Sequence, residues 1–344
     1  VSSMSTATRD AQWGRIGLKT LVVAPSAVVK ISQNQVATVG ALPTSQAAVP
    51  PYMQTLKMTL VMEGRAPREA ETIVCMIVTK RSDGFFSQEV IPLPFSDRAV
   101  YNGVVYHAGK LYMLLCDPKT DEHYEPDSIY LPFSSRGSVA VLSLDTQQCT
   151  VLPATDLPCS LFTRCSFMLG DTWYIAGWNA KRAPILLTYQ PLSNRWGRGE
   201  SGVFGNMTPT LSSTVVGDVA YLMCEDSEFY PYVASFTEES GFRSVARLPK
   251  TSDALQMFSI GRHLFVYDTD TTDEPIVLLS YNTVSGEWVE YPSAVRLSVG
   301  CVGEHIGDGV LILFTGQSIF YREPECLYLT LSLPPGDDNV SLGL

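Results

Sequence analysis

The sequence has 344 residues, of which 45% are hydrophobic and 17% are charged, with a formal net charge of −11 and an isoelectric point near 4.9. This apolar content is sufficient for a large core and excludes an intrinsically disordered chain. The acidic balance argues against direct binding of nucleic acid, which requires a basic surface. The longest apolar runs have the length of strands and fall short of the roughly 20 residues that span a bilayer, so we expect no membrane insertion.

Residues 1–17 form an N-terminal segment that we expect to be flexible. The apolar stretch that follows has no secretory signal in front of it, which predicts an intracellular protein, cytoplasmic or nuclear. Eight cysteines are spread along the chain without a Cys-x-x-Cys pair. This pattern indicates buried free thiols in a reducing compartment and no zinc site.

The first structural unit is predicted at residues 27–95. Residues 28–40 have the pattern of a β-hairpin, and residues 72–94 predict a third strand, a turn at 81–84 and a last strand. No long amphipathic helix is expected here or later in the chain. The unit is therefore a four-stranded antiparallel meander.

A repeated pattern organises the rest of the chain. A glycine between two apolar runs recurs at positions 109, 170, 217, 261 and 307, and a large residue recurs at positions 149, 196, 242 and 288. The successive spacings are 61, 47, 44 and 46 for the first column and 47, 46 and 46 for the second. Short strands separated by turn residues within a repeat of about 46 residues are typical of propeller blades.

Two of these hairpins, at residues 189–196 and 281–288, begin with Tyr and end with Trp. In these two hairpins the chain resembles the kelch family, whose blades also carry a glycine pair after the second strand. One glycine of that pair is kept at Gly177 and Gly316. The resemblance covers about residues 97–335 and implies a β-propeller that binds proteins as an adaptor or as a subunit of a larger assembly. No Trp-Asp dipeptide occurs, which argues against the WD40 family.

The predicted fold is therefore an all-β, six-bladed, kelch-like β-propeller that spans residues 18–335, with a tail at 336–344. The expected blades are residues 27–95, 97–153, 162–200, 210–249, 254–292 and 296–334. The last blade lacks an obvious fourth strand, so we expect residues 18–23 to complete it and close the ring. Closure removes sheet edges that would otherwise promote aggregation.

The predicted function is protein binding through the face that carries the loops between second and third strands, because long loops on a rigid scaffold are common binding sites. These loops are rich in acidic residues and tyrosine, which favours a partner with a basic segment. The candidate partner-binding residues are Arg65, Arg68, Asp121, Glu122, Tyr124, Lys181, Arg182, Glu225, Asp226, Glu228, Tyr230, Asp268, Asp270 and Asp273. Solvated loops that keep an acidic protein soluble are the alternative explanation.

No catalytic residue, metal site or cofactor is predicted. The sequence contains no Gly-x-Ser-x-Gly, His-Glu-x-x-His or phosphate-binding glycine loop. The spacing of Asp268, Asp270 and Asp273 lacks the glycine and terminal glutamate of a helix-loop-helix calcium site. The alternative function is a propeller enzyme or carbohydrate-binding propeller that uses the central channel, where converging carboxylate, His or Arg side chains would favour chemistry.

Overall fold

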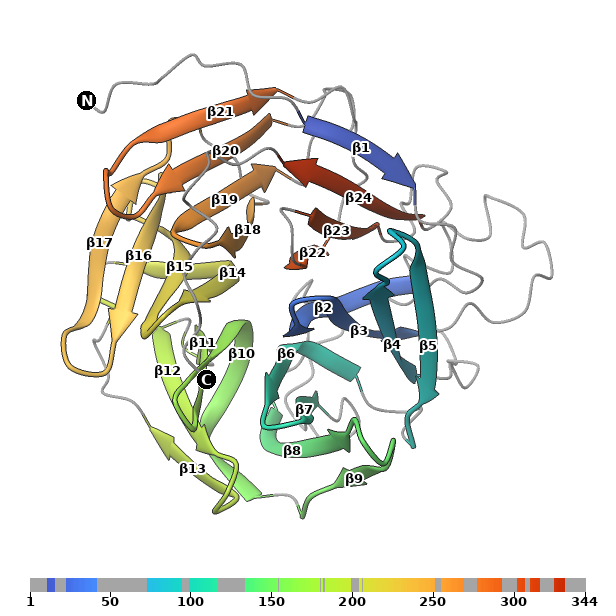
Figure 1. Cartoon of the computed structure of the whole chain (residues 1–344). Coiled ribbons are helices and arrows are strands. Elements are labelled where there is room, and N and C mark those ends of the chain that lie inside the picture. The colour runs from blue at the N-terminus through green and yellow to red at the C-terminus, as the bar shows by residue number, and fades with distance from the viewer. Residues whose placement is uncertain are drawn as a thin grey trace, which may run out of the picture.

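Antiparallel four-stranded meanders repeat along the chain around a common axis, so the protein is an all-β propeller, as expected (Figure 1). The computed structural model describes residues 11–15, 23–41, 73–94, 99–116, 134–153, 155–179, 181, 183–198, 204–205, 207–250, 255–268, 277–292, 302–306, 310–315 and 325–331. Within these ranges there is no helix that could cross a bilayer.

Each meander runs outward from the axis. The first comprises β2 (Val23–Ser32), β3 (Gln35–Ala41), β4 (Ile73–Lys80) and β5 (Phe86–Pro92). The next two comprise β6 (Ala99–His107), β7 (Lys110–Cys116), β8 (Ser134–Ser143) and β9 (Cys149–Val151), then β10 (Thr155–Leu169), β11 (Thr172–Trp178), β12 (Pro184–Gln190) and β13 (Arg195–Arg198). The following two comprise β14 (Thr208–Val216), β15 (Val219–Glu225), β16 (Pro231–Thr237) and β17 (Gly241–Arg247), then β18 (Leu255–Ile260), β19 (His263–Asp268), β20 (Val277–Asn282) and β21 (Trp288–Pro292). The last comprises β22 (Val302–Ile306), β23 (Val310–Thr315), β24 (Glu325–Leu331) and, from the N-terminal region, β1 (Ala11–Arg15).

Hydrogen bonding joins these strands into five sheets, so the expectation of six separate blades was wrong. The difference arises at β10, which begins at Thr155 instead of near residue 162. Its first part pairs with β8, where Thr155 faces Gly137 and Leu161 faces Ser134, and its second part pairs with β11. The β6–β9 and β10–β13 meanders thereby merge into one eight-stranded sheet. The innermost strands β2, β6, β10, β14, β18 and β22 still contact one another in a closed ring.

The N-terminal strand β1 closes the ring by pairing with β24, from Ala11 opposite Leu331 to Arg15 opposite Leu327. A closing strand from the N-terminal region was expected, but at residues 18–23. Residues 18–22 lie outside the described ranges. Residues 11–15 are thus a strand and not part of a flexible segment. Residues 18–23 were expected to close the ring because they form an apolar run. Val23 instead begins the innermost strand β2, and the closing strand is determined by hydrogen bonds between backbone groups.

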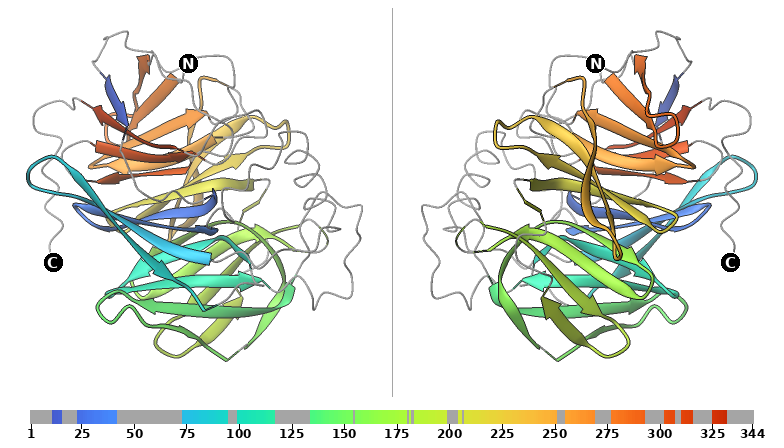
Figure 2. Two further views of the ribbon diagram at one scale, coloured as in Figure 1. Left: turned by 90° about the vertical axis from the view of Figure 1, so that its right-hand side faces the viewer. Right: turned by 90° about the vertical axis from the view of Figure 1, so that its left-hand side faces the viewer.

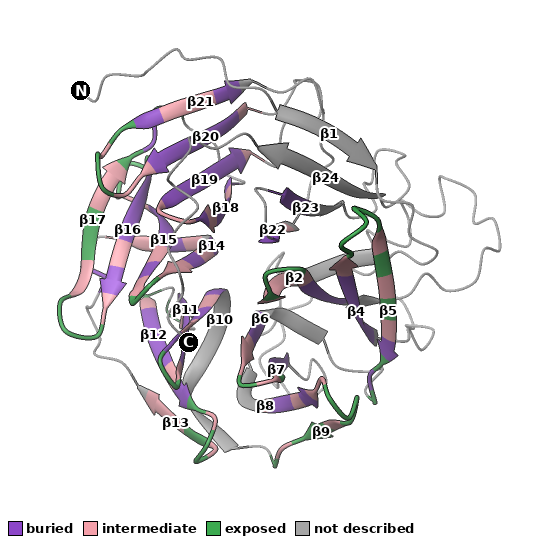
Figure 3. Ribbon diagram, in the orientation of Figure 1, coloured by how far each residue is buried: buried purple, intermediate pink, exposed green. Residues whose placement is uncertain are grey.

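The core lies between neighbouring meanders. One apolar cluster joins Cys75 and Ile91 to Met113 and Leu142, and another joins Phe167 and Ala176 to residues of β15 and β16. Buried residues lie mainly on the middle strands, and exposed residues lie on the outer strands and turns (Figure 3). Each meander therefore buries its two faces only by stacking on its neighbours.

Cys75, Cys149, Cys165 and Cys224 are free thiols. Burial raises the pKa of the Cys75 thiol to about 12 and that of Cys149 to about 11. These thiols therefore stay protonated and unreactive at neutral pH.

In two outer hairpins, the recurring large residue packs against a tyrosine with tilted rings. Tyr189 lies opposite Trp196, with ring centroids 4.9 Å apart, and Tyr281 lies opposite Trp288, with centroids 5.0 Å apart. The glycine column explains the inner turns: Gly109, for example, has a φ of +78°, which favours glycine. The turned views show the β4–β5 hairpin extending beyond the neighbouring strands (Figure 2).

Deleting residues 1–15 should lower the melting temperature and promote self-association, because the edge of β24 then lacks its hydrogen-bonding partner. The matched control is deletion of residues 1–10, which keeps β1. Differential scanning calorimetry and analytical ultracentrifugation measure both effects. Equal melting temperatures and a monomer in both truncations would contradict the role assigned to β1.

Candidate protein-binding face

Connections within each meander alternate between the two faces of the propeller. We call the face with the β11–β12, β15–β16 and β19–β20 connections the loop face. The opposite face, with the tight β14–β15, β16–β17 and equivalent turns, is the turn face. The predicted binding residues that the structure describes lie in these connections or at the strand ends next to them.

The β15–β16 connection is held by the side chain of Asp226. Its Oδ1 accepts hydrogen bonds from the amides of Glu228 at 2.9 Å and Tyr230 at 3.0 Å. The Asp226 amide in turn donates to the Tyr230 carbonyl at 3.1 Å. The loop is therefore closed at its base by three hydrogen bonds, although it lies at the surface.

Arg247, at the end of β17, adds a second restraint to this loop. Its Nη2 lies 2.9 Å from Asp226 Oδ2, and its guanidinium carbon lies 4.4 Å from the centroid of the Tyr230 ring. The hydrogen bond from the Tyr230 amide, assisted by those from Glu228 and Arg247, lowers the pKa of Asp226. The carboxylate therefore stays ionised well into the acidic range and keeps the loop closed.

The tip of this loop presents an aromatic side chain to solvent. Phe229 is 77% exposed, and Tyr230 is 42% exposed. Phe229 also has a φ of +62°, a left-handed conformation that is unfavourable for a bulky residue. Its amide donates to the Asp226 carbonyl at 3.0 Å, which helps to hold this conformation. Strain of this kind is concentrated at functional sites.

The neighbouring β11–β12 connection repeats the same hydrogen-bond pattern 47 residues earlier, at Asn179. Asn179 Oδ1 accepts from the amides of Lys181 at 2.9 Å and Ala183 at 3.0 Å, and the Asn179 amide donates to the Ala183 carbonyl at 3.0 Å. The two loops share a five-residue framework but present different side chains. Lys181 is exposed in the first loop, and Phe229 is exposed in the second.

Six predicted site residues lie within the described part of the chain. Asp226, Glu228 and Tyr230 are brought together in the β15–β16 loop, and Glu225 ends β15. Asp268 ends β19, and Lys181 lies in the β11–β12 connection. The residues that lie outside the described ranges are Arg65, Arg68, Asp121, Glu122, Tyr124, Arg182, Asp270 and Asp273.

The predicted set omitted Phe229, Arg247 and Asn179. Phe229 was left out because the selection was based on charged residues and tyrosine. Arg247 lies 21 residues from Asp226, on another strand, and no local pattern connects the two. A search for an Asn or Asp at equivalent positions of successive repeats would have found Asn179 and Asp226 together.

Around the central axis, described polar side chains mostly connect neighbouring innermost strands. Ser213 Oγ donates to the Ser166 carbonyl at 3.0 Å, and the hydroxyls of Thr214 and Ser259 lie 2.9 Å apart. The described ranges contain no group of three or more His, Cys, Asp or Glu side chains that could hold a metal ion. The hydroxyl contacts tie β10, β14 and β18 together along the ring.

The contact between β2 and β22 differs because it is charged. Lys30 Nζ lies 3.2 Å from His305 Nδ1, and the His305 amide donates to Glu304 Oε1 at 2.8 Å. Burial raises the pKa of Glu304 to about 7, against the opposing effects of the His305 amide and Lys30. Burial also lowers the pKa of Lys30. The junction between the two ends of the ring thus contains ionisable groups that are costly to bury.

No family model matches the sequence, and no curated protein matches it. Among solved structures, the crystal structure of TolB from Acinetobacter baumannii is similar over 79% of this chain at 11% identity, with a TM-score of 0.48. The chain spans 55% of that structure's length. A likeness at this level carries no inference about function.

Replacing Asp226 with alanine should loosen the β15–β16 loop, because the amides of Glu228 and Tyr230 lose their acceptor. Hydrogen–deuterium exchange should show faster exchange across this loop. Asp226→Asn, which keeps a side-chain oxygen, should have a smaller effect. Asp218→Ala, at an exposed turn of the same sheet, is the control. Unchanged exchange in Asp226→Ala would show that the side chain does not hold the loop.

Replacing Glu304 with glutamine should stabilise the protein more at pH 8 than at pH 5. Since the folded-state pKa of about 7 exceeds the ordinary value of 4.5, the folded state binds more protons between these values, and stability falls as pH rises through this window. The glutamine variant avoids this loss, on the order of 1–3 kcal/mol. Urea unfolding at both pH values measures the difference in the free energy of unfolding between variant and wild type. The exposed Glu239→Gln is the control. Parallel pH profiles for wild type and Glu304→Gln would contradict the assignment.

Proposed function

We propose that the chain is a protein-binding module that engages its partner through the loop face. The observation that carries this proposal is the pre-organised tip of the β15–β16 loop, where Phe229 is held exposed in an unfavourable conformation. Exposed aromatic residues on rigid supports are typical of binding hot spots, because little side-chain entropy is lost on binding. A loop with only a solubilising role has no need of a strained, exposed phenylalanine.

The partner that suits this face carries a basic segment next to an apolar or aromatic side chain. Glu225 and Glu228 flank the aromatic tip, and the whole chain has a net charge of −11. Acidic surroundings attract a basic segment and speed its association, while the aromatic contact supplies affinity. The module then acts as a kelch-like adaptor or complex subunit inside the cell.

Affinity capture from native lysate tests the proposal with two matched variants. Phe229→Ala removes an exposed side chain from the loop face, and Leu192→Ala removes one, 87% exposed, from the turn face. The first should weaken capture of a specific partner by roughly 30-fold, as expected for a hot-spot residue. The second should leave capture unchanged.

A further variant, Phe229→Gly, separates binding from folding. Glycine accepts a φ of +62° without strain, so this variant should melt at or above the wild-type temperature while losing the partner. Retention of all wild-type partners by both Phe229 variants would overturn the proposal.

A further inference from the structure

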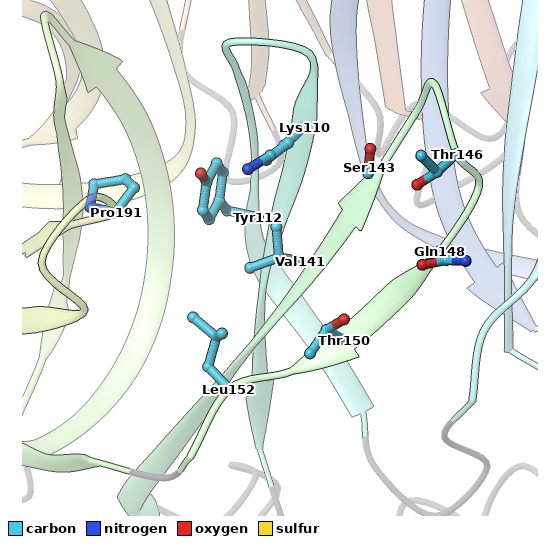
Figure 4. A pocket seen from close by; sticks show the side chains of 9 residues that line it. All are labelled: Lys110, Tyr112, Val141, Ser143, Thr146, Gln148, Thr150, Leu152 and Pro191. Atoms are coloured by element: carbon cyan, nitrogen blue, oxygen red, sulfur yellow. The ribbon is translucent and has the colours of Figure 1, made fainter.

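A shallow pocket of about 340 Å³ lies at the turn-face end of the β6–β9 meander (Figure 4). Its floor is formed by strands β7, β8 and β9, and Pro191, from the β12–β13 turn, forms part of its wall. Tyr112 faces Val141, and Val141 faces Thr150, so these three side chains lie in one row on the same face of the sheet.

Strand pairing joins the two meanders beside the pocket at one end only, while an apolar cluster that includes Tyr112 and Tyr189 packs them together. The first part of β8 pairs with β10 near the loop face, at Ser134, Arg136 and Gly137. The later part of β8 pairs with the short strand β9 instead. The β6–β9 and β10–β13 meanders are thus hydrogen-bonded to each other near the loop face, and the pocket occupies the opposite end, between β9 and Pro191.

The lining combines polar and apolar side chains and carries one positive charge. Lys110 is the charged residue among the described residues that line the pocket, and it forms no ion pair with a described carboxylate. Ser143, Gln148 and Thr150 line the same space, and their side chains make no hydrogen bond within the described ranges. Burial raises the pKa of Tyr112, so its hydroxyl stays protonated and able to donate.

We propose that this pocket binds a small polyol that carries one anionic group, with Lys110 against the anion and Ser143, Gln148 and Thr150 against the hydroxyls. A lone ammonium in a pocket without carboxylates favours an anion, even on an acidic protein. The hydroxyl and amide side chains both donate and accept, which suits the hydroxyls of a polyol. Val141 supplies an apolar patch for the carbon skeleton, and the volume suits one sugar ring.

The polyol site is independent of the proposed protein-binding function, because it lies on another face and is formed by other residues. The anion could be a phosphate or a carboxylate, and both have the chemistry that Lys110 recognises. Glucose 6-phosphate and glucuronate are therefore both used as probes, and glucose and inorganic phosphate are the comparison ligands.

Titration of the full chain, followed by saturation-transfer NMR, tests the proposal. At least one anionic sugar should bind, and it should bind more tightly than glucose or inorganic phosphate. Lys110→Gln should weaken this binding about tenfold, and Thr150→Val should weaken it severalfold. Lys181→Gln, which removes an exposed lysine from the loop face, should leave it unchanged.

Both pocket residues are exposed, so their variants should melt as the wild type does, and a loss of binding is then due to the site. Three outcomes would overturn the proposal. These are no binding of either anionic sugar up to about 10 mM, equal binding by Lys110→Gln and wild type, and binding of inorganic phosphate as tightly as the sugar probes.

Discussion

A four-stranded meander has two apolar faces and can bury neither of them alone. This constraint determines the architecture, because each meander must lie between two others and the row must close on itself. The apolar clusters accordingly join residues of neighbouring meanders, as Cys75 joins Met113. The ring is closed by the pairing of β1 with β24, which come from the two ends of the sequence. The charged contact of Lys30, Glu304 and His305 lies at the junction where the first and last innermost strands meet.

Because the strands of the ring form the core, the residues in the connections between strands can vary. The Asn179 and Asp226 loops show how this variation is organised, because one hydrogen-bond framework presents Lys181 in one repeat and Glu228 at the equivalent position of the next. The repeated framework fixes the position of these side chains, and the residue type at each position determines the chemistry. The loop face is therefore a set of equivalent positions on a rigid support, which is an arrangement suited to recognition.

The eight-stranded sheet is the main departure from a regular repeat. Strand β10 pairs with the part of the β8 edge nearest the loop face. Strand β9 pairs with the rest of that edge and is only three residues long. The face of β7 and β8 that carries Tyr112 and Val141 packs on the next meander in an apolar cluster with Trp173 and Tyr189, and Pro191 approaches the same face at the pocket. The pocket therefore lies beside the place where the strand pairing departs from a regular repeat.

Local sequence patterns predicted most of the strands, the tight turns and the Tyr–Trp hairpins, because these features depend on residues close together in the chain. Gly109 and the Tyr189–Trp196 pair are examples in which residue type and spacing specify the local backbone. The number of separate sheets, the identity of the closing strand and the pairing of Asp226 with Arg247 emerged only from the folded structure. These features rest on backbone pairing and contacts between residues far apart in the chain, and hydrogen bonds between backbone groups leave no pattern in the sequence.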